Sequence, residues 1–169
     1  MLRDTTVLYD FRAVTEADLA MIGEWLARPH VAEWWDDPET EIAAIRDHID
    51  CDSVEPLIVE LEGRSIAYLQ SYDPHMEDNH PYADQPFGTL GIDLTIGLAE
   101  LVGIGHGSAI ARQFVEELFE EGAPRVIIDP APDNVGAIRA YEKAGFREID
   151  RRTSIHGDVV LMALDNPDA

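Results

Sequence analysis

The stretch Val102-Gly-Ile-Gly-His-Gly-Ser108 decides the fold, because it is a glycine-spaced turn between an extended segment and a helix. Before it, residues 89–96 alternate apolar side chains with others, which predicts a β-strand. After it, residues 108–119 repeat apolar side chains at helical spacing, and Gly122 and Pro124 stand just past the end. The amides freed by such a turn and the positive end of the helix point to one place, which is typical of anion binding.

Periodicity predicts further elements on both sides of this turn. Upstream, strands are expected at residues 7–14, 57–61 and 66–72, and helices at residues 15–28, near His30 and at 39–49. Downstream, strands are expected at residues 126–128, 148–155 and 158–164, with a helix from Asn134 to Ala144, a stop at Gly145 and a turn at His156-Gly157. The length of 169 residues fits one domain, residues 1–169.

Residues 73–88 show no periodicity. They carry His75, His80, three prolines and several acids. A loop of this length inside a compact domain is often functional, so we interpret it as a substrate lid.

The charge of the chain is strongly negative. Thirty-four acidic against 12 basic residues give a formal net charge of −22, and Lys143 is the only lysine. Nucleic-acid binding is not expected, because neutralising phosphates needs clustered Lys and Arg. The acidity has two interpretations, attraction of cationic ligands or adaptation to a salt-rich cytoplasm, and composition does not separate them.

Targeting, redox and metal signals are weak. No apolar run approaches the roughly 20 residues of a membrane-spanning helix, and no signal-peptide core is found, so we expect a cytoplasmic protein that does not bind membranes. Cys51 is the only cysteine, which excludes an internal disulfide. The six histidines lack paired ligand spacing, so no metal is predicted.

Other phosphate-binding folds fit poorly. A Rossmann unit would place the glycine turn after a first strand with an acid about 20 residues later, and a phosphate-binding loop of nucleotidases would need Gly-Lys-Ser/Thr. Ser71 and Ser108 lack the strand-turn-helix nucleophile pattern, which favours direct transfer in a ternary complex over an acyl-enzyme.

The order strand, glycine turn, helix, strand and Asn-capped helix ending in Ala-Gly-Phe resembles the GNAT superfamily of acetyltransferases. The segment Pro130-Ala-Pro-Asp-Asn-Val-Gly-Ala-Ile-Arg-Ala-Tyr-Glu-Lys-Ala-Gly-Phe146 looks like the helix of that family. Nearly the entire chain is more similar still to the aminoglycoside 6′-N-acetyltransferases, through Glu33-Trp-Trp35, Tyr68-Leu-Gln-Ser-Tyr72, Gly91-Ile-Asp93 and Asp129-Pro-Ala-Pro-Asp-Asn134.

This resemblance implies an α/β (α+β) fold, with a mixed, mostly antiparallel twisted sheet of about seven strands flanked by about four helices. It also implies that acetyl-CoA is the cosubstrate and that its pyrophosphate rests on the glycine turn. The family often has Arg or Gln, then Lys or Gly, where this chain has Val102 and Ile104, so backbone amides would hold the pyrophosphate almost alone. The implied cofactor-binding residues are Leu94, Thr95, Gly103, Gly105, His106, Gly107, Ser108, Asn134 and Tyr141.

Two residues are implied as catalytic. Asp93 interrupts an apolar strand, where an aspartate is locally unfavourable. In the resembling group this carboxylate meets the acceptor amine and helps to remove its proton, although a bound structural carboxylate is the alternative. Tyr141 is implied as the proton donor to the departing thiolate, which suits a phenol, and a half-buried tyrosine is its structural alternative.

Aromatic faces and carboxylates suit an aminated sugar, through stacking, cation–π attraction and charge-assisted hydrogen bonds. Each tryptophan taken singly is more often part of a core. The expected acceptor-binding residues are Trp34, Trp35, Tyr72, Asp93, Asp129 and Asp158.

The expected reaction moves an acetyl group from acetyl-CoA to a primary amine of a small polycation, with the 6′-amine of aminoglycoside antibiotics preferred. One alternative keeps the fold and changes the acceptor to a hydroxylamine or amine of siderophore assembly, or to a polyamine. A second alternative is a module that binds acetyl-CoA without catalysis. The chain is expected to be a monomer or a homodimer.

Overall fold

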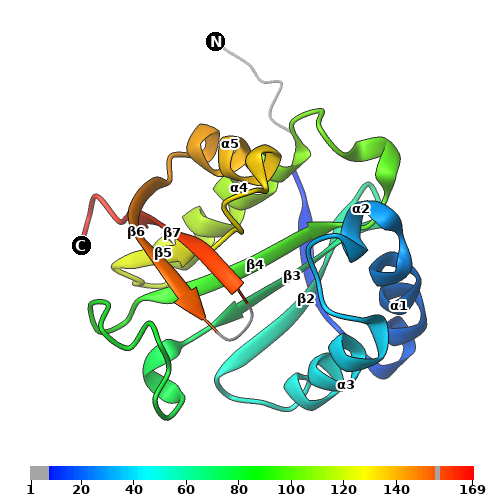
Figure 1. Cartoon of the computed structure of the whole chain (residues 1–169), viewed down its shortest axis with the longest axis horizontal. Helices are drawn as coiled ribbons and strands as arrows, with labels where there is room; N and C mark the ends of the chain where they lie inside the picture. The colour runs from blue at the N-terminus through cyan, green and yellow to red at the C-terminus, as the bar shows by residue number, and fades with distance from the viewer. Residues whose placement is uncertain (1–7, 155–156) are drawn as a thin grey trace.

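A computed structural model describes residues 8–154 and 157–169 (Figure 1). The strands are β1 (Asp10–Ala13), β2 (Val54–Leu61), β3 (Arg64–Tyr72), β4 (Leu90–Ile96), β5 (Arg125–Ile128), β6 (Arg147–Ser154) and β7 (Gly157–Asp165). The α-helices are α1 (Leu19–Ala27), α2 (Pro29–Ala32), α3 (Pro38–His48), α4 (His106–Glu120) and α5 (Val135–Ala144). Three 3₁₀-helices are also present, η1 (Glu16–Asp18), η2 (Pro74–Met76) and η3 (Ala99–Leu101).

The strands form one seven-stranded sheet in the order β1-β2-β3-β4-β5-β7-β6. Every pairing is antiparallel except that of β4 with β5. The predicted mixed, mostly antiparallel sheet is therefore confirmed. Within the described residues five α-helices flank it, close to the expected number of about four, and the short α2 is the helix expected near His30.

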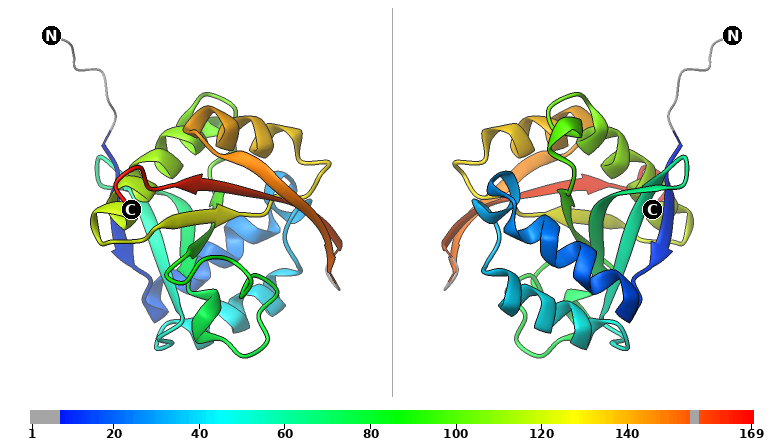
Figure 2. Two further views of the ribbon diagram at one scale, coloured as in Figure 1. Left: turned by 90° about the vertical axis from the view of Figure 1, so that its left-hand side faces the viewer. Right: turned by 90° about the vertical axis from the view of Figure 1, so that its right-hand side faces the viewer.

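Alternating side chains divide the core between the two faces of this sheet. Ile58 and Tyr68 pack against α1, α2 and α3 on one face. Val59 and Leu69, one residue further along each strand, pack with α4 and α5 on the other. Figure 2 shows the two helical layers on opposite sides of the strands.

Local signals in the sequence set most element ends. Asn134 accepts a hydrogen bond from the Ala137 N–H at 3.3 Å and begins α5, and Gly145 ends it at a φ of 114°. The predicted hairpin of β2 and β3 closes through Glu62 and Gly63, which both adopt positive φ. The predicted strand start at Val7, the predicted strand end at Ile155 and His156 of the predicted His156-Gly157 turn lie outside the described residues.

Candidate active site

Strands β4 and β5 lie side by side only at their first residues. Their parallel pairing joins Leu90 to Val126 and Gly91 to Ile127, and no further pair follows within the part of the chain that the structure describes. On its other edge, β4 stays paired with β3 as far as Ile96. The backbone N–H and C=O groups of β4 that point away from β3 beyond Gly91 therefore have no partner on β5, and the Ile96 carbonyl oxygen is paired with His30 Nε2 at 2.9 Å.

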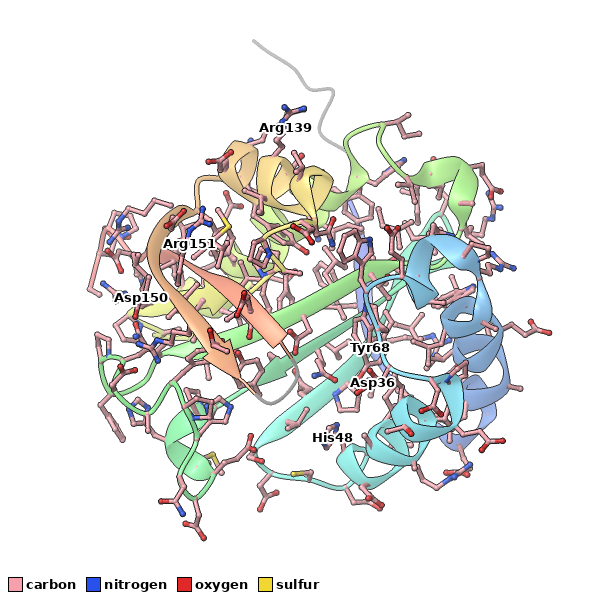
Figure 3. All side chains as sticks on the ribbon, viewed as in Figure 1. Asp36, His48, Tyr68, Arg139, Asp150 and Arg151 are labelled. Atoms are coloured by element: carbon pink, nitrogen blue, oxygen red, sulfur yellow. The ribbon has the colours of Figure 1, made fainter. Side chains whose placement is uncertain are left out.

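The first cavity, which we call the glycine groove, opens beside this unpaired edge and has a volume of about 390 Å³. No carboxylate is among the residues that line it, and its basic side chains include Arg139 and Lys143 of α5. Arg139 projects outward from the helix at one end of the molecule (Figure 3). The lining residues are His30, Trp34, Leu94, Thr95, Ile96, Val102, Gly103, Gly105, Gly107, Ser108, Asn134, Gly136, Ala137, Arg139, Ala140, Tyr141 and Lys143.

The start of α4 forms the glycine-rich wall of this groove. Gly103 and Gly105 have φ of 79° and 102°, in the left-handed region that favours glycine. Gly105 is the N-cap of α4 and no side chain caps the helix. The first N–H groups of α4 have no acceptor within the helix, so the turn presents donors and a positive helix end to an anion.

The second cavity, which we call the acidic cavity, has a volume of about 710 Å³. Five of its lining residues carry carboxylates, and none is lysine, arginine or histidine. A cavity of one charge sign with protein walls concentrates ligands of the opposite sign. The lining residues are Glu33, Trp34, Trp35, Asp36, Thr40, Glu41, Ala44, Gln70, Asp93, Leu94, Ile128, Asp129, Pro130, Ala131, Asn134, Ala137 and Tyr141.

The two cavities meet at a common wall. Five residues line both of them, namely Trp34, Leu94, Asn134, Ala137 and Tyr141. A ligand in the groove and a ligand in the acidic cavity would therefore approach each other next to Tyr141 and the unpaired edge of β4.

Asp93 lines the acidic cavity next to Leu94 of this common wall, a region that we call the junction, and belongs to a chain of hydrogen bonds across β3 and β4. Gln70, its partner in register, donates from Nε2 to Asp93 Oδ2 at 2.9 Å. Tyr68 donates from its hydroxyl to Gln70 Oε1 at 2.7 Å, which fixes the orientation of the amide. Burial, and next the charge of Asp129, raise the pKa of Asp93 to about 7, against the smaller opposing effect of the Gln70 hydrogen bond.

Asp129 follows β5 and is the second carboxylate of this junction. The Tyr82 hydroxyl donates to Asp129 Oδ2 at 2.6 Å. Burial raises the pKa of Asp129, while the hydrogen bond from Tyr82 acts in the opposite direction. Two carboxyls in one desolvated site resist double ionisation, so a proton is held there at a pH where exposed aspartates have lost theirs.

Tyr141 reaches the junction from α5. Its side chain is buried, and its ring packs edge-to-face on Phe146 at 6.1 Å between centroids. Burial raises its pKa above the ordinary value, followed by the charges of Asp93 and Asp129. The hydroxyl thus keeps its proton at neutral pH, and Tyr141 is one of the residues that line both cavities.

Comparison with known proteins agrees with this arrangement. A family model described as an acetyltransferase (GNAT) domain matches residues 14–153. The chain belongs to the GNAT acetyltransferase family. The predicted family and fold are confirmed, and the chain is an acyltransferase.

Relatives with named activities match most of this chain. Aminoglycoside N(6′)-acetyltransferase type 1 from Klebsiella pneumoniae is 36% identical over 160 residues, covering 89% of this chain and 80% of the relative. The solved complex of AAC(6′)-Ib with ribostamycin and coenzyme A superimposes with a TM-score of 0.84 at 34% identity, over 93% of each chain. Lysine N-acyltransferase MbtK from Mycobacterium sp. (strain MCS) is 29% identical over 155 residues, covering 88% of this chain and 63% of the relative.

Most residues expected at the GNAT site line the two cavities. The glycine groove contains the expected cofactor-binding residues except His106, whose ring instead pairs with the Tyr9 hydroxyl at 2.7 Å. The acidic cavity contains four of the expected acceptor-binding residues, Trp34, Trp35, Asp93 and Asp129.

Two expected acceptor-binding residues line neither cavity. Tyr72 is buried, with its ring over Gly91 and stacked on His80 at 5.4 Å between centroids. Asp158 is exposed at the start of β7 and accepts a hydrogen bond from the Thr153 hydroxyl at 2.7 Å. The path of residues 73–88 brings His80 onto Tyr72, and the register of β6 with β7 places Asp158 beside Thr153. Local sequence patterns predict neither of these long-range arrangements.

The sequence analysis also missed residues of the site. Glu33, Asp36, Glu41 and Gln70 line the acidic cavity. Gln70 lies within a quoted motif, but only the pairing of β3 with β4 shows that it faces Asp93. Glu33 is likewise part of the Glu33-Trp-Trp35 motif, whereas the only signal of Asp36 and Glu41 in the sequence is a high local density of negative charge.

Within residues 8–154 and 157–169, no helix is long and apolar enough to cross a lipid bilayer. Among the same residues, no group of three or more His, Cys, Asp or Glu side chains is arranged to hold a metal ion.

Proposed function

We propose that this GNAT enzyme transfers the acetyl group of acetyl-CoA to a primary amine of a small polycation, and that the acceptor amine is the 6′-amine of an aminoglycoside. The observation that supports the proposal is the wall shared by the two cavities beside Asp93, with a glycine-rich turn at a helix start on one side and five carboxylates on the other.

The glycine groove fits acetyl-CoA, whose thioester supplies an activated acetyl group when it is bound. Uncapped amides at the start of α4 would hold the pyrophosphate, in the place where Gly103 and Gly105 leave the backbone bare. The open edge of β4 at Leu94 and Thr95 would hydrogen-bond the amides of the pantetheine arm. Arg139 and Lys143 add positive charge to a groove that lacks carboxylates.

The acidic cavity fits an acceptor with several ammonium groups. Each carboxylate on its wall can receive a charge-assisted hydrogen bond, and Trp34 and Trp35 offer ring faces to a sugar. A neutral or anionic acceptor would leave these carboxylates without compensation, so the wall selects polycations.

The residues at the junction account for both proton transfers. Asp93, as a carboxylate, accepts the proton of the acceptor ammonium and leaves a nucleophilic amine. The amine nitrogen forms a bond to the acetyl carbon, and the carbon–sulfur bond breaks after the carbonyl oxygen has been stabilised by N–H groups of β4. Tyr141 donates its hydroxyl proton to the departing sulfur, and the second proton that the nitrogen loses as the amide forms restores the Tyr141 hydroxyl. Asp93 releases the first proton to solvent, so one proton passes from nitrogen to sulfur and one leaves the site.

The regiochemistry can be tested with one matched pair of acceptors. Neomycin and paromomycin differ at the 6′ position, where the first has an amine and the second a hydroxyl. We expect release of CoA thiol with neomycin and tobramycin, and none above background with paromomycin. Equal thiol release with neomycin and paromomycin would show that another amine is the acceptor.

The relationship to a lysine N-acyltransferase favours one second candidate, an amine or hydroxylamine acceptor of siderophore assembly. The same thiol assay with lysine, putrescine and an N-hydroxylated diamine distinguishes the two candidates, and thiol release with these acceptors would support the second one. They carry fewer positive charges than the acidic cavity has carboxylates, so the cavity favours an aminoglycoside over them. Acetyl-CoA binding by calorimetry without acetylation of any of these amines would instead identify a non-catalytic module.

A further inference from the structure

The connection between β3 and β4 reaches a carboxylate of the acidic cavity through the side chain of Tyr82, which is not itself among the lining residues. Tyr82 lies in residues 73–88, is only 5% exposed, and packs with Ile127 and Leu161 on the sheet. Its hydroxyl makes the 2.6 Å hydrogen bond to Asp129 described above. The segment interpreted as a lid from the sequence therefore carries a buried donor to a carboxylate of the site.

Contacts on three sides hold Tyr82 in this place. The Arg152 guanidinium of β6 lies 5.4 Å from the ring centroid and donates to the Pro81 carbonyl oxygen at 2.7 Å. Arg152 also forms an ion pair with Asp84 at 2.7 Å. The Tyr82 N–H donates to His80 Nδ1 at 3.0 Å, and the His80 ring stacks on Tyr72. Because these contacts restrict the Tyr82 side chain, its hydroxyl can orient the Asp129 carboxylate.

The hydrogen bond connects two carboxyls that share one environment. The charge of Asp129 contributes to the raised pKa of Asp93, and the Tyr82 hydroxyl can donate to Asp129 only while that oxygen is an acceptor. The other titratable groups whose charges act on Asp93 or Asp129, or are acted on by them, are Glu41 of α3, Tyr68 and Tyr72 of β3, His80, and Tyr141 of α5.

We propose that Tyr82 is a positioning residue that keeps Asp129 ionised and oriented, and thereby assigns the proton shared by the two carboxyls to Asp93. Asp129 then acts as a fixed anchor for an ammonium group, and Asp93 is the group that loses and gains the proton. The role of Asp129 toward the acceptor rests on the proposed function, whereas the assignment of the proton does not.

Titration of the free protein tests the assignment without turnover. In Tyr82→Phe, we expect the Asp129 carboxyl, followed by side-chain ¹³C NMR, to titrate about one pH unit higher than in the wild type, because a hydrogen bond to its charged form is lost. A fraction of Asp93 should then lose its proton at a lower pH than in the wild type, because the proton shared by the two carboxyls is partly held by Asp129. Titration curves that superimpose on those of the wild type would overturn the proposal.

Two further variants separate this role from general support of the fold. Asp84→Asn removes the ion pair with Arg152 but keeps the Tyr82 hydroxyl, so it should leave both titrations as in the wild type. In an Asp129→Asn background, Tyr82→Phe should no longer change the Asp93 titration, because the carboxyl through which Tyr82 acts on Asp93 has been removed. An equal shift of Asp93 with and without Asp129 would show that Tyr82 acts through the fold instead.

In steady-state kinetics, loss of the Tyr82 hydroxyl should change the KM for the amine acceptor and not the KM for acetyl-CoA. At pH 6, Tyr82→Phe should raise the KM for neomycin about tenfold and leave the KM for acetyl-CoA within about twofold. Equal increases in both KM values would contradict the proposal. If the titrations behave as expected while no amine is acetylated, the proposed function fails and the assignment of the proton stands.

Discussion

The two cavities that meet at Tyr141 are built from different parts of the chain. The glycine groove relies on backbone, with two positive-φ glycines, an uncapped helix start and an open strand edge, and its charged side chains are cationic. The acidic cavity relies on side chains, five of them carboxylates contributed by α3, its preceding loop, β4 and the end of β5. A ligand held by backbone amides is insensitive to most substitutions, whereas a ligand held by carboxylates depends on each charge and on pH.

The largest effect should come from the carboxylate at the junction. Asp93→Asn keeps a hydrogen-bonding side chain beside Gln70 but removes the base, so kcat should fall about a thousandfold. Acetyl-CoA affinity, measured by calorimetry, should stay within about twofold, because the groove does not use this carboxylate. Turnover at the wild-type rate in a variant with an unchanged melting curve would refute the role of Asp93.

Tyr141→Phe tests whether the Tyr141 hydroxyl acts in the chemical step or in substrate binding. Loss of the proton donor to sulfur should lower kcat about thirtyfold and change both KM values little, because thiolates leave more easily than most groups. The ring contact with Phe146 is preserved in this variant, so the folded structure should persist. Steady-state kinetics with both substrates varied gives the result, and a loss expressed only in KM would argue for a binding role.

The pH dependence follows from Asp93. Its pKa of about 7 means that the carboxyl is protonated, and inactive as a base, at lower pH. The value of kcat/KM for the acceptor should therefore fall about tenfold per pH unit below pH 7. Buffers of constant ionic strength isolate this effect, and a profile flat down to pH 5 would mean that another group accepts the proton.

A matched pair of glycine substitutions tests the backbone side of the comparison. Gly105 and Gly122 flank α4, have φ of 102° and 106°, and have open space where a Cβ would stand. Alanine at either position should therefore lower the free energy of unfolding by a similar amount, about 1–2 kcal/mol. Only Gly105→Ala should raise the KM for acetyl-CoA, about fivefold, because it disturbs the turn at the groove. Equal kinetics in the two variants would show that this turn does not hold the pyrophosphate.

Salt should act on the two cavities with opposite signs. The chain has a net charge of −22, so it attracts a polycation and repels the anionic acetyl-CoA until ions screen both interactions. Raising the salt concentration from about 50 to 500 mM should increase the KM for neomycin about threefold and leave or lower that for acetyl-CoA. A KM for neomycin that does not change with salt would favour salt adaptation as the reason for the acidity.

Local signals in the sequence predict the groove better than the acidic cavity. Gly103, Gly105 and the Asn134 cap act through their own backbone conformation, so their roles are visible within a few residues of sequence. The acidic cavity depends on long-range pairing, which brings Gln70 opposite Asp93 and Tyr82 onto Asp129. No local pattern encodes such pairing, and this is why Tyr72 and Asp158 were expected in a cavity that they do not line.

Lys143 lines the glycine groove and is the only lysine of the sequence. Thioesters such as acetyl-CoA modify exposed ε-amines without any enzyme, and in this chain such modification of ε-amines is confined to Lys143, in the groove that we propose for acetyl-CoA. That amine is also a natural attachment point for a fluorescent label at the mouth of the groove, so occupancy by the cosubstrate can be followed on the unaltered sequence.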